Sequence, residues 1–246
     1  MVKAIEIIKY LESIYPESLK AKWDVTEGLI QGDVNKEIKK IIVAVELRKE
    51  IIETKADMII LHHPPIFGPE KIITNSSFKE IKDKDIIVYA LHSRIDKSGD
   101  INKSLTFEIF GKNIKIDKIL EDGTIISELQ KTLELDNLIK IIKSKLNLSS
   151  LKFISKDKMV KRIAIHGGEG FNHHHVIDAV KENIDTYIAG DLSHHLAEHA
   201  FFYDVNFIDI EHHNEQFGLI KIKNLIENKF KLKCNLVLVS SIWSHS

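Results

Sequence analysis

Two adjacent histidines, His62 and His63, follow directly on the apolar run Met58–Leu61. A short apolar run of this kind is typical of a buried β-strand, so we expect the pair at the end of a strand. Imidazole nitrogens are common ligands of zinc, iron, manganese, cobalt and nickel. Successive side chains on a strand point to opposite faces. The two histidines are therefore expected to bind two neighbouring ions, one each, rather than a single ion.

Three further polar clusters follow predicted strands: His92 with Asp96, His166 before the turn GGEG, and the segment EHHNE at 211–215. In parallel α/β sheets, ligands bind outside the carboxyl ends of the strands, which is where these clusters are expected. Asp96 is a candidate bridge between two ions. The clusters together predict a dinuclear metal site with open coordination positions for water, as a catalytic site requires.

His212 and Glu215 extend this candidate site. They stand three residues apart at the start of a predicted helix, so their side chains can face the same point. The neighbouring His213 is an alternative to His212 as the ligand. We therefore predict the metal ligands to be His62, His63, Asp96, His212 and Glu215.

Each histidine also has a structural interpretation. A single histidine at the end of a strand is commonly a hydrogen-bonded structural residue, which applies to His92 and His166 taken alone. The histidines at 173–175 open a predicted helix, where solvated polar residues are common. His195 and His199 have the spacing of a zinc-protease helix, but Leu196 stands where that motif requires glutamate, so this class is excluded.

Two histidines are candidates for catalytic proton transfer, His92 and His194. Imidazole suits this role because its ordinary pKa is close to neutrality. The glycine-rich turn after His166 matches neither the dinucleotide-binding motif nor the P-loop, which leaves an anion cradle and a plain tight turn as alternatives.

The chain has 246 residues, of which 43% are hydrophobic and 29% charged, as in ordinary soluble proteins. Its net charge of −1 gives no support to nucleic acid binding. The single cysteine excludes an intramolecular disulfide, and with no cleavable signal peptide it predicts a cytoplasmic protein. No apolar run reaches the roughly 18 residues that cross a bilayer, so no membrane association is expected.

The positioning elements alternate between strand and helix. Predicted strands in the first half are 40–47, 57–63 and 86–93, and those in the second half begin near 162, 185, 206 and 235. This rhythm predicts an α/β protein with two similar lobes, largely parallel sheets and a metal site in the cleft between the lobes. The first lobe is expected at 1–111 and the second at 112–246, with the alternative that 206–246 returns to complete the first lobe. Whether the less regular segment 112–160 forms a lid stays open.

Five segments of the chain together resemble the Nif-three-like (NGG-interacting factor three-like) family, also labelled GTP cyclohydrolase 1 type 2 homologues. They are AKWDVTEGLIQGD, ILHHPPIF, YALHSRIDKSGDINKSL, DTYIAGDLSHH and IDIEHHNEQFG. The resemblance runs through nearly the whole chain. It implies that the metal ligands are His62, His63, Asp96, His212 and Glu215. The family usually separates the last two by four residues instead of three.

The resemblance further implies two divalent metal ions and ring-shaped homohexamers. We expect a metal-dependent hydrolase that acts on a nucleotide-like or phosphorylated small molecule. The alternative is a non-catalytic, ring-shaped metal-binding module that interacts with a protein partner or with nucleic acid. Neither the metal nor the substrate follows from the residues.

Overall fold

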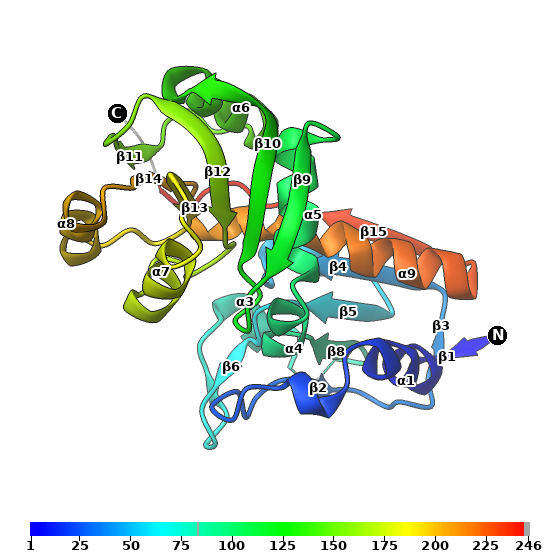
Figure 1. Cartoon of the computed structure of the whole chain (residues 1–246). Coiled ribbons are helices and arrows are strands. Elements are labelled where there is room, and N and C mark those ends of the chain that lie inside the picture. The colour runs from blue at the N-terminus through cyan, green and yellow to red at the C-terminus, as the bar shows by residue number, and fades with distance from the viewer. Residues whose placement is uncertain (83, 244–246) are drawn as a thin grey trace. The chain divides into compact units, whose positions relative to one another are not determined.

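The computed structural model describes residues 1–82 and 84–243, which divide into two units (Figure 1). Unit 1 consists of Met1–Ser98 and Leu219–Val239. Unit 2 consists of Gly99–Gly218 and the C-terminal residues from Ser240. The sequence assigned helix α5 (Asp100–Phe110) to the first lobe, whereas in the structure it belongs to unit 2.

A five-stranded sheet forms the centre of unit 1, in the order β15-β4-β5-β8-β2. The strands β15, β4, β5 and β8 are parallel, and β2 pairs antiparallel with β8 at the edge. The strands of the sheet are β2 (Gly28–Gln31), β4 (Lys40–Ala44), β5 (Met58–Leu61), β8 (Ile87–Ala90) and β15 (Lys233–Val237). Short two-stranded pairs join β1 (Val2–Lys3) to β3 (Glu37–Ile38) and β6 (Ile66–Phe67) to β7 (Ile72–Ile73).

The central strands of this sheet are buried on both faces, which explains their continuous apolar sequence. One face, including Ile42, Ile59 and Val88, packs on Ile51 and Phe78 from the neighbouring helices. The helices of unit 1 are α1 (Ala4–Ile14), η1 (Glu17–Leu19), α2 (Lys49–Ile52), α3 (Ser76–Lys79), α4 (Ser93–Lys97) and α9 (Ile220–Phe230).

Unit 2 contains a six-stranded mixed sheet in the order β11-β14-β13-β12-β10-β9. The strands β12, β13 and β14 are parallel, while β9, β10 and β11 join antiparallel to their neighbours. These strands are β9 (Ile114–Ile119), β10 (Ile125–Glu134), β11 (Lys152–Ile154), β12 (Met159–Ile165), β13 (Thr186–Ala189) and β14 (Asn206–Asp209). The segment 112–160 thus supplies three complete strands of this sheet, the first two residues of β12 and one helix.

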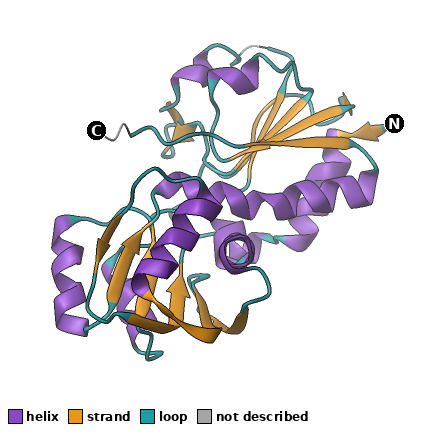
Figure 2. Cartoon of the chain, turned by 90° about the horizontal axis from the view of Figure 1, so that it is seen from above, coloured by secondary structure: helices purple, strands orange, loops and turns teal. Residues whose placement is uncertain are grey.

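Helices cover both faces of the unit 2 sheet (Figure 2). On one face, Leu105 of α5 and Leu138 of α6 share a core cluster with Ile163. On the other face, Val176 of α7 and Leu196 of α8 share a cluster with Tyr187 and neighbouring residues. The bounds of the remaining helices are α6 (Leu135–Leu146), α7 (His173–Val180), α8 (His194–Tyr203) and the 3₁₀ helix η2 (His212–Leu219).

The prediction of an α/β protein is confirmed. Within residues 1–82 and 84–243, the helices are too short and too polar to cross a lipid bilayer. The single cysteine, Cys234, lies in β15 and is buried, and this burial raises the pKa of its thiol to about 12. A thiol of this kind is unreactive at neutral pH, in agreement with a packing role.

Candidate metal centre

His62 and His63 follow β5 without a break, as the sequence predicted. The N–H of His62 donates to Ala44 O at 3.0 Å, and that of His63 donates to Val45 O at 2.7 Å. These bonds continue the pairing with β4 beyond the last strand residue. The backbone of the two histidines is therefore fixed at the carboxyl end of a parallel sheet, where ligands bind in this class of fold.

The ring of His62 is almost completely buried, and contacts at both ring nitrogens fix its orientation. Its Nδ1 contacts Leu91 O at 3.1 Å, and its Nε2 lies 3.4 Å from Oδ1 of Asp96. A ring N–H that donates to a carbonyl leaves the other nitrogen to bind a cation, which is the usual arrangement of metal-binding histidines. This geometry fits His62 and Asp96 as ligands of one ion.

Three imidazoles converge in unit 1. Ring centroids lie 4.9 Å apart for His62 and His63, 5.0 Å for His62 and His92, and 5.6 Å for His63 and His92. Each ring offers a nitrogen within 4.8 Å of a nitrogen of both others. Such a group of nitrogens can hold a divalent transition metal ion.

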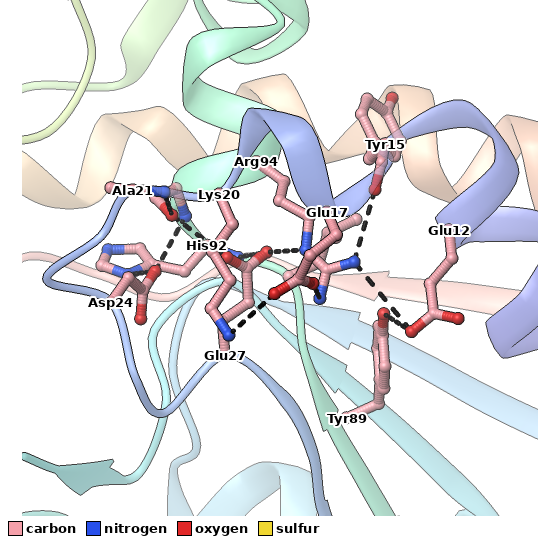
Figure 3. Close-up of polar contacts among 12 residues, drawn as sticks. Glu12, Tyr15, Glu17, Lys20, Ala21, Asp24, Glu27, Tyr89, His92 and Arg94 are labelled. Carbon is pink, nitrogen blue, oxygen red and sulfur yellow. Dashed lines mark hydrogen bonds and ion pairs between the residues drawn. The ribbon is translucent and has the colours of Figure 1, made fainter. Parts of the chain in front are cut away.

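Asp24 orients His92 (Figure 3). The Oδ2 atom of the buried Asp24 lies 2.9 Å from Nδ1 of His92 and accepts from the N–H of Ser93 at 3.2 Å. Burial raises the pKa of Asp24, but the hydrogen bonds with His92 and Ser93 outweigh it and lower the pKa to about 2. Asp24 is therefore ionised at neutral pH, and Nε2 of His92 is the ring nitrogen that it leaves for a ligand or a proton.

A buried ion pair between Arg94 and Glu27 adjoins this arrangement. Nε of Arg94 lies 3.1 Å from Oε1 of Glu27, and both side chains are buried (Figure 3). Glu27 also accepts from the hydroxyl of Ser93 at 3.1 Å and from the N–H of His92 at 3.1 Å. The backbone of His92 is thus held by Glu27 while its ring is held by Asp24.

No functional role was predicted from the sequence for Asp24, Glu27 or Arg94. The two acidic residues lie in the segment WDVTEG, which carried the family resemblance but has no helical or strand period. The sequence held one indication of a buried polar network here. Two acidic residues lie in a family motif but outside every predicted helix and strand.

Unit 2 carries the second predicted ligand pair. His212 opens the 3₁₀ helix η2, and its Nε2 lies 3.3 Å from Oε1 of the buried Glu215. A 3₁₀ helix has three residues per turn, so side chains three apart stack on one face. The spacing of three in this chain is therefore matched by the local helix type. His213 faces Glu211 instead, with 3.4 Å between Nδ1 and Oε2.

The ring of His212 lies between two carboxylates. Its Nδ1 is 2.5 Å from Oδ2 of Asp191, and its Nε2 faces Glu215. Burial lowers the pKa of His212, but the hydrogen bonds with Asp191 and Glu215 outweigh it and raise the pKa to about 11. This strongly negative environment favours a cation, and a carboxylate behind a histidine is a common arrangement at metal sites.

Gly168 packs against this pair. Its φ is +63°, and a Cβ atom there would lie 2.3 Å from Oε2 of Glu215 and 3.5 Å from Nε2 of His212. Only glycine adopts this backbone conformation at no cost and also leaves room for the carboxylate. The turn after His166 thus shapes the surroundings of Glu215.

The described contacts of His194 are with Glu198 and His195, and not with His212 or Glu215 of the same unit. Its side chain is 84% exposed on α8, and its Nε2 lies 3.7 Å from Oε1 of Glu198, one turn further along the helix. Its catalytic role stays a prediction. The joint binding of two ions by the five predicted ligands His62, His63, Asp96, His212 and Glu215 stays a prediction as well.

The family model Duf34/NIF3 (NGG1p interacting factor 3) matches residues 2–243, so the chain belongs to this family. A relative from Clostridium perfringens, named GTP cyclohydrolase 1 type 2 homolog, is 31% identical over 93% of this chain and 92% of its own length. The Helicobacter pylori protein named GTP cyclohydrolase 1 type 2 is 27% identical over 92% of this chain and 91% of its own length.

A solved structure shares the fold. The crystal structure of a hypothetical protein from Staphylococcus aureus superimposes with a TM-score of 0.85 at 24% identity. The match covers 99% of this chain and 99% of that chain. The resemblance found in the sequence is therefore confirmed, in family and in fold.

Proposed function

We propose that the chain is a metal-dependent hydrolase that acts on a nucleotide-like or phosphorylated small molecule. The observation that carries the proposal is the group formed by His62, His63, His92 and Asp96 at the carboxyl end of the unit 1 sheet. It combines ligands for a divalent cation with a histidine whose ring is held by a buried carboxylate. A second group, His212 with Glu215, offers further ligands.

A bound divalent cation lowers the pKa of a coordinated water and stabilises negative charge on a substrate oxygen. The protein residues supply position and proton transfer. Asp24 accepts from Nδ1 of His92, so that Nε2 can take a proton from a nearby water or return one to a leaving group. The aspartate also stabilises the imidazolium that forms when His92 takes the proton.

The substrate class rests on the relatives. The Helicobacter pylori relative bears the name GTP cyclohydrolase 1 type 2, which describes hydrolytic opening of the guanine ring of GTP. Phosphoester cleavage needs the same ligands and the same proton transfer. We therefore assign the chain to hydrolysis of a nucleotide-like or phosphorylated compound. The screen below determines whether a ring bond or a phosphoester bond is cleaved.

The test is a screen of nucleotides and phosphoesters with tag-free protein, before and after chelation and with Zn²⁺, Mn²⁺, Fe²⁺, Co²⁺ or Ni²⁺ restored. Chelation is expected to abolish turnover, and one of the metals is expected to restore it. Asp96→Asn should remove activity with an unchanged circular dichroism spectrum. Glu50→Gln, which changes an exposed carboxylate on α2, should leave activity intact. Turnover that survives complete metal removal would contradict the proposal.

The non-catalytic module is the competing outcome of this screen. Protein that retains metal, turns over none of the compounds and binds single-stranded nucleic acid with strong salt dependence would favour it. Light scattering of the purified chain tests the homohexamer, which stays a prediction from the family resemblance.

A further inference from the structure

A second group of possible ligands lies wholly within unit 2. It consists of Asp122 in the turn between β9 and β10, His166 at the end of β12, and His175 in the first turn of α7. Each offers a ligand atom within 4.8 Å of those of the other two. The rings of His166 and His175 are stacked, with centroids 4.6 Å apart and planes inclined by 22°.

His166 is buried, and its two ring nitrogens have different surroundings. Nδ1 lies 2.6 Å from Gly167 O, so this nitrogen carries the proton and donates it to the carbonyl. Nε2 is then an acceptor, and no described residue donates a hydrogen bond to it. A buried imidazole acceptor without a donor is costly, and it is the arrangement expected of a metal ligand.

Asp122 shows the same division between its two oxygens. Oδ1 accepts from the N–H of Thr124 at 2.8 Å, which fixes the carboxylate in the turn. Oδ2 is buried, accepts no hydrogen bond from the described residues, and lies 3.6 Å from Nε2 of His175. Two buried acceptor atoms, one of them on a carboxylate, thus belong to one group of possible ligands and have no hydrogen-bond donor among the described residues. A cation bound between them satisfies both.

The buried side chain of Asn102 connects the two backbone segments that carry His166 and Asp122. Oδ1 of Asn102 accepts from the N–H of Gly167 at 2.7 Å, next to His166. Nδ2 of the same amide donates to Gly123 O at 2.9 Å, next to Asp122. Asn102 is 1% exposed. The amide thus holds the turn and the strand end at a fixed separation before any ligand arrives, which favours binding.

We propose that Asp122, His166 and His175, none of which is among the ligands predicted from the sequence, together bind a divalent transition metal ion. Two imidazoles and one carboxylate are a ligand set for Zn²⁺, Co²⁺ or Fe²⁺. Three protein ligands leave at least one coordination position for water. The ion would connect the β9–β10 turn, the end of β12 and α7. It gives His175, one of the three adjacent histidines at 173–175, a function as a ligand.

Binding at His175 requires a change of tautomer. Nδ1 of His175 lies 2.7 Å from Nδ2 of Asn172, so Nδ1 accepts and Nε2 carries the proton toward Asp122. The ion takes the place of that proton, which moves to Nδ1. The amide of Asn172 then turns, so that its oxygen accepts from Nδ1 instead of from the N–H of His175, its present helix-cap contact. Metal binding is therefore coupled to the start of α7.

The test is titration of the metal-free, tag-free full chain with Co²⁺, followed by its visible absorption. Asp122→Asn and His175→Gln are each expected to lose one equivalent of bound cobalt relative to the wild type. His174→Gln, an exposed neighbour on the same helix, is expected to keep it. Asp96→Asn should also keep this equivalent, so failure of the proposed hydrolase site and failure of this site are distinguishable. Unchanged cobalt stoichiometry in both Asp122→Asn and His175→Gln would overturn the proposal.

A second measurement does not depend on the folding of variants. Wild-type crystals soaked in Zn²⁺ are expected to give an anomalous peak at about 2.0–2.2 Å from Oδ2 of Asp122 and Nε2 of His166. A crystal whose density at this point has no anomalous signal contains a water bridge, and that result would also overturn the proposal.

Discussion

Asp24 and His92 stand 68 positions apart in the chain, and their side chains meet with 2.9 Å between Oδ2 and Nδ1. The contact joins a loop residue of the N-terminal segment to the residue that precedes α4. It sets which nitrogen of His92 faces the neighbouring histidines, and this gives Asp24 a measurable role.

Asp24→Asn should weaken metal binding and slow turnover, because the amide N–H can donate to Nδ1 of His92. The ring proton then sits on Nε2, the nitrogen that must be free to bind the ion or to take a proton. Carboxylates that orient metal-site histidines typically contribute 10–100-fold, so we expect a loss of about this size in Zn²⁺ affinity by calorimetry. Glu37→Gln changes an exposed carboxylate in β3 and serves as the control. Equal affinities of Asp24→Asn and Glu37→Gln would argue against a positioning role.

Gly168→Ala should displace the carboxylate of Glu215, because the new Cβ would lie 2.3 Å from Oε2. Gly111→Ala is the matched control in the same unit, since Gly111 also has a positive φ, +58°, but has open space around its Cβ position. Both variants should lose on the order of 1–3 kcal/mol of stability from backbone strain. Only Gly168→Ala should also bind Co²⁺ more weakly, and equal cobalt binding by both variants would contradict the assigned role.

Arg94→Met should destabilise the protein strongly, because it leaves the buried carboxyl group of Glu27 without its ion-pair partner. Removing one partner of a buried pair costs roughly 3–5 kcal/mol. Arg48→Met breaks the half-exposed pair with Glu46 and should cost about 0–1 kcal/mol. Urea unfolding followed by circular dichroism measures both.

The double variant Arg94→Met with Glu27→Gln completes this comparison. It should be more stable than the sum of the two single changes predicts, because no unpaired charge stays buried. Single effects that add to within about 0.5 kcal/mol would show that the two side chains are energetically independent.

The central strands of the unit 1 sheet could be predicted from the sequence, because strands buried on both faces are apolar throughout. The runs around Ile60 and Val88 are apolar throughout, so strands were expected there, and the position of His62 and His63 at a strand end followed. The loop that contains Asp24 and Glu27 offered no such pattern. Its two acidic residues are buried by contacts with residues 92–94, far away in sequence, and no local propensity reports such contacts.

The sequence also did not predict which type of helix begins at His212. The predicted helix that starts near His212 and Glu215 is divided in the structure into η2, which ends at Leu219, and α9, which begins at Ile220. A 3₁₀ turn and an α-helical turn share the same apolar pattern over so few residues. The 3₁₀ geometry of η2 is what brings His212 and Glu215 together at a spacing of three residues.

The pairing of β15 with β4 has a consequence during synthesis. Residues 233–237 lie beside residues 40–44, so β4 lacks this neighbour until residues 233–237 have left the ribosome, long after β4 itself. The six strands of unit 2 come from one continuous stretch, 114–209, and can assemble earlier. The sheet of unit 2 can therefore be completed before that of unit 1, and the edge of β4 needs protection from aggregation until β15 has been synthesised.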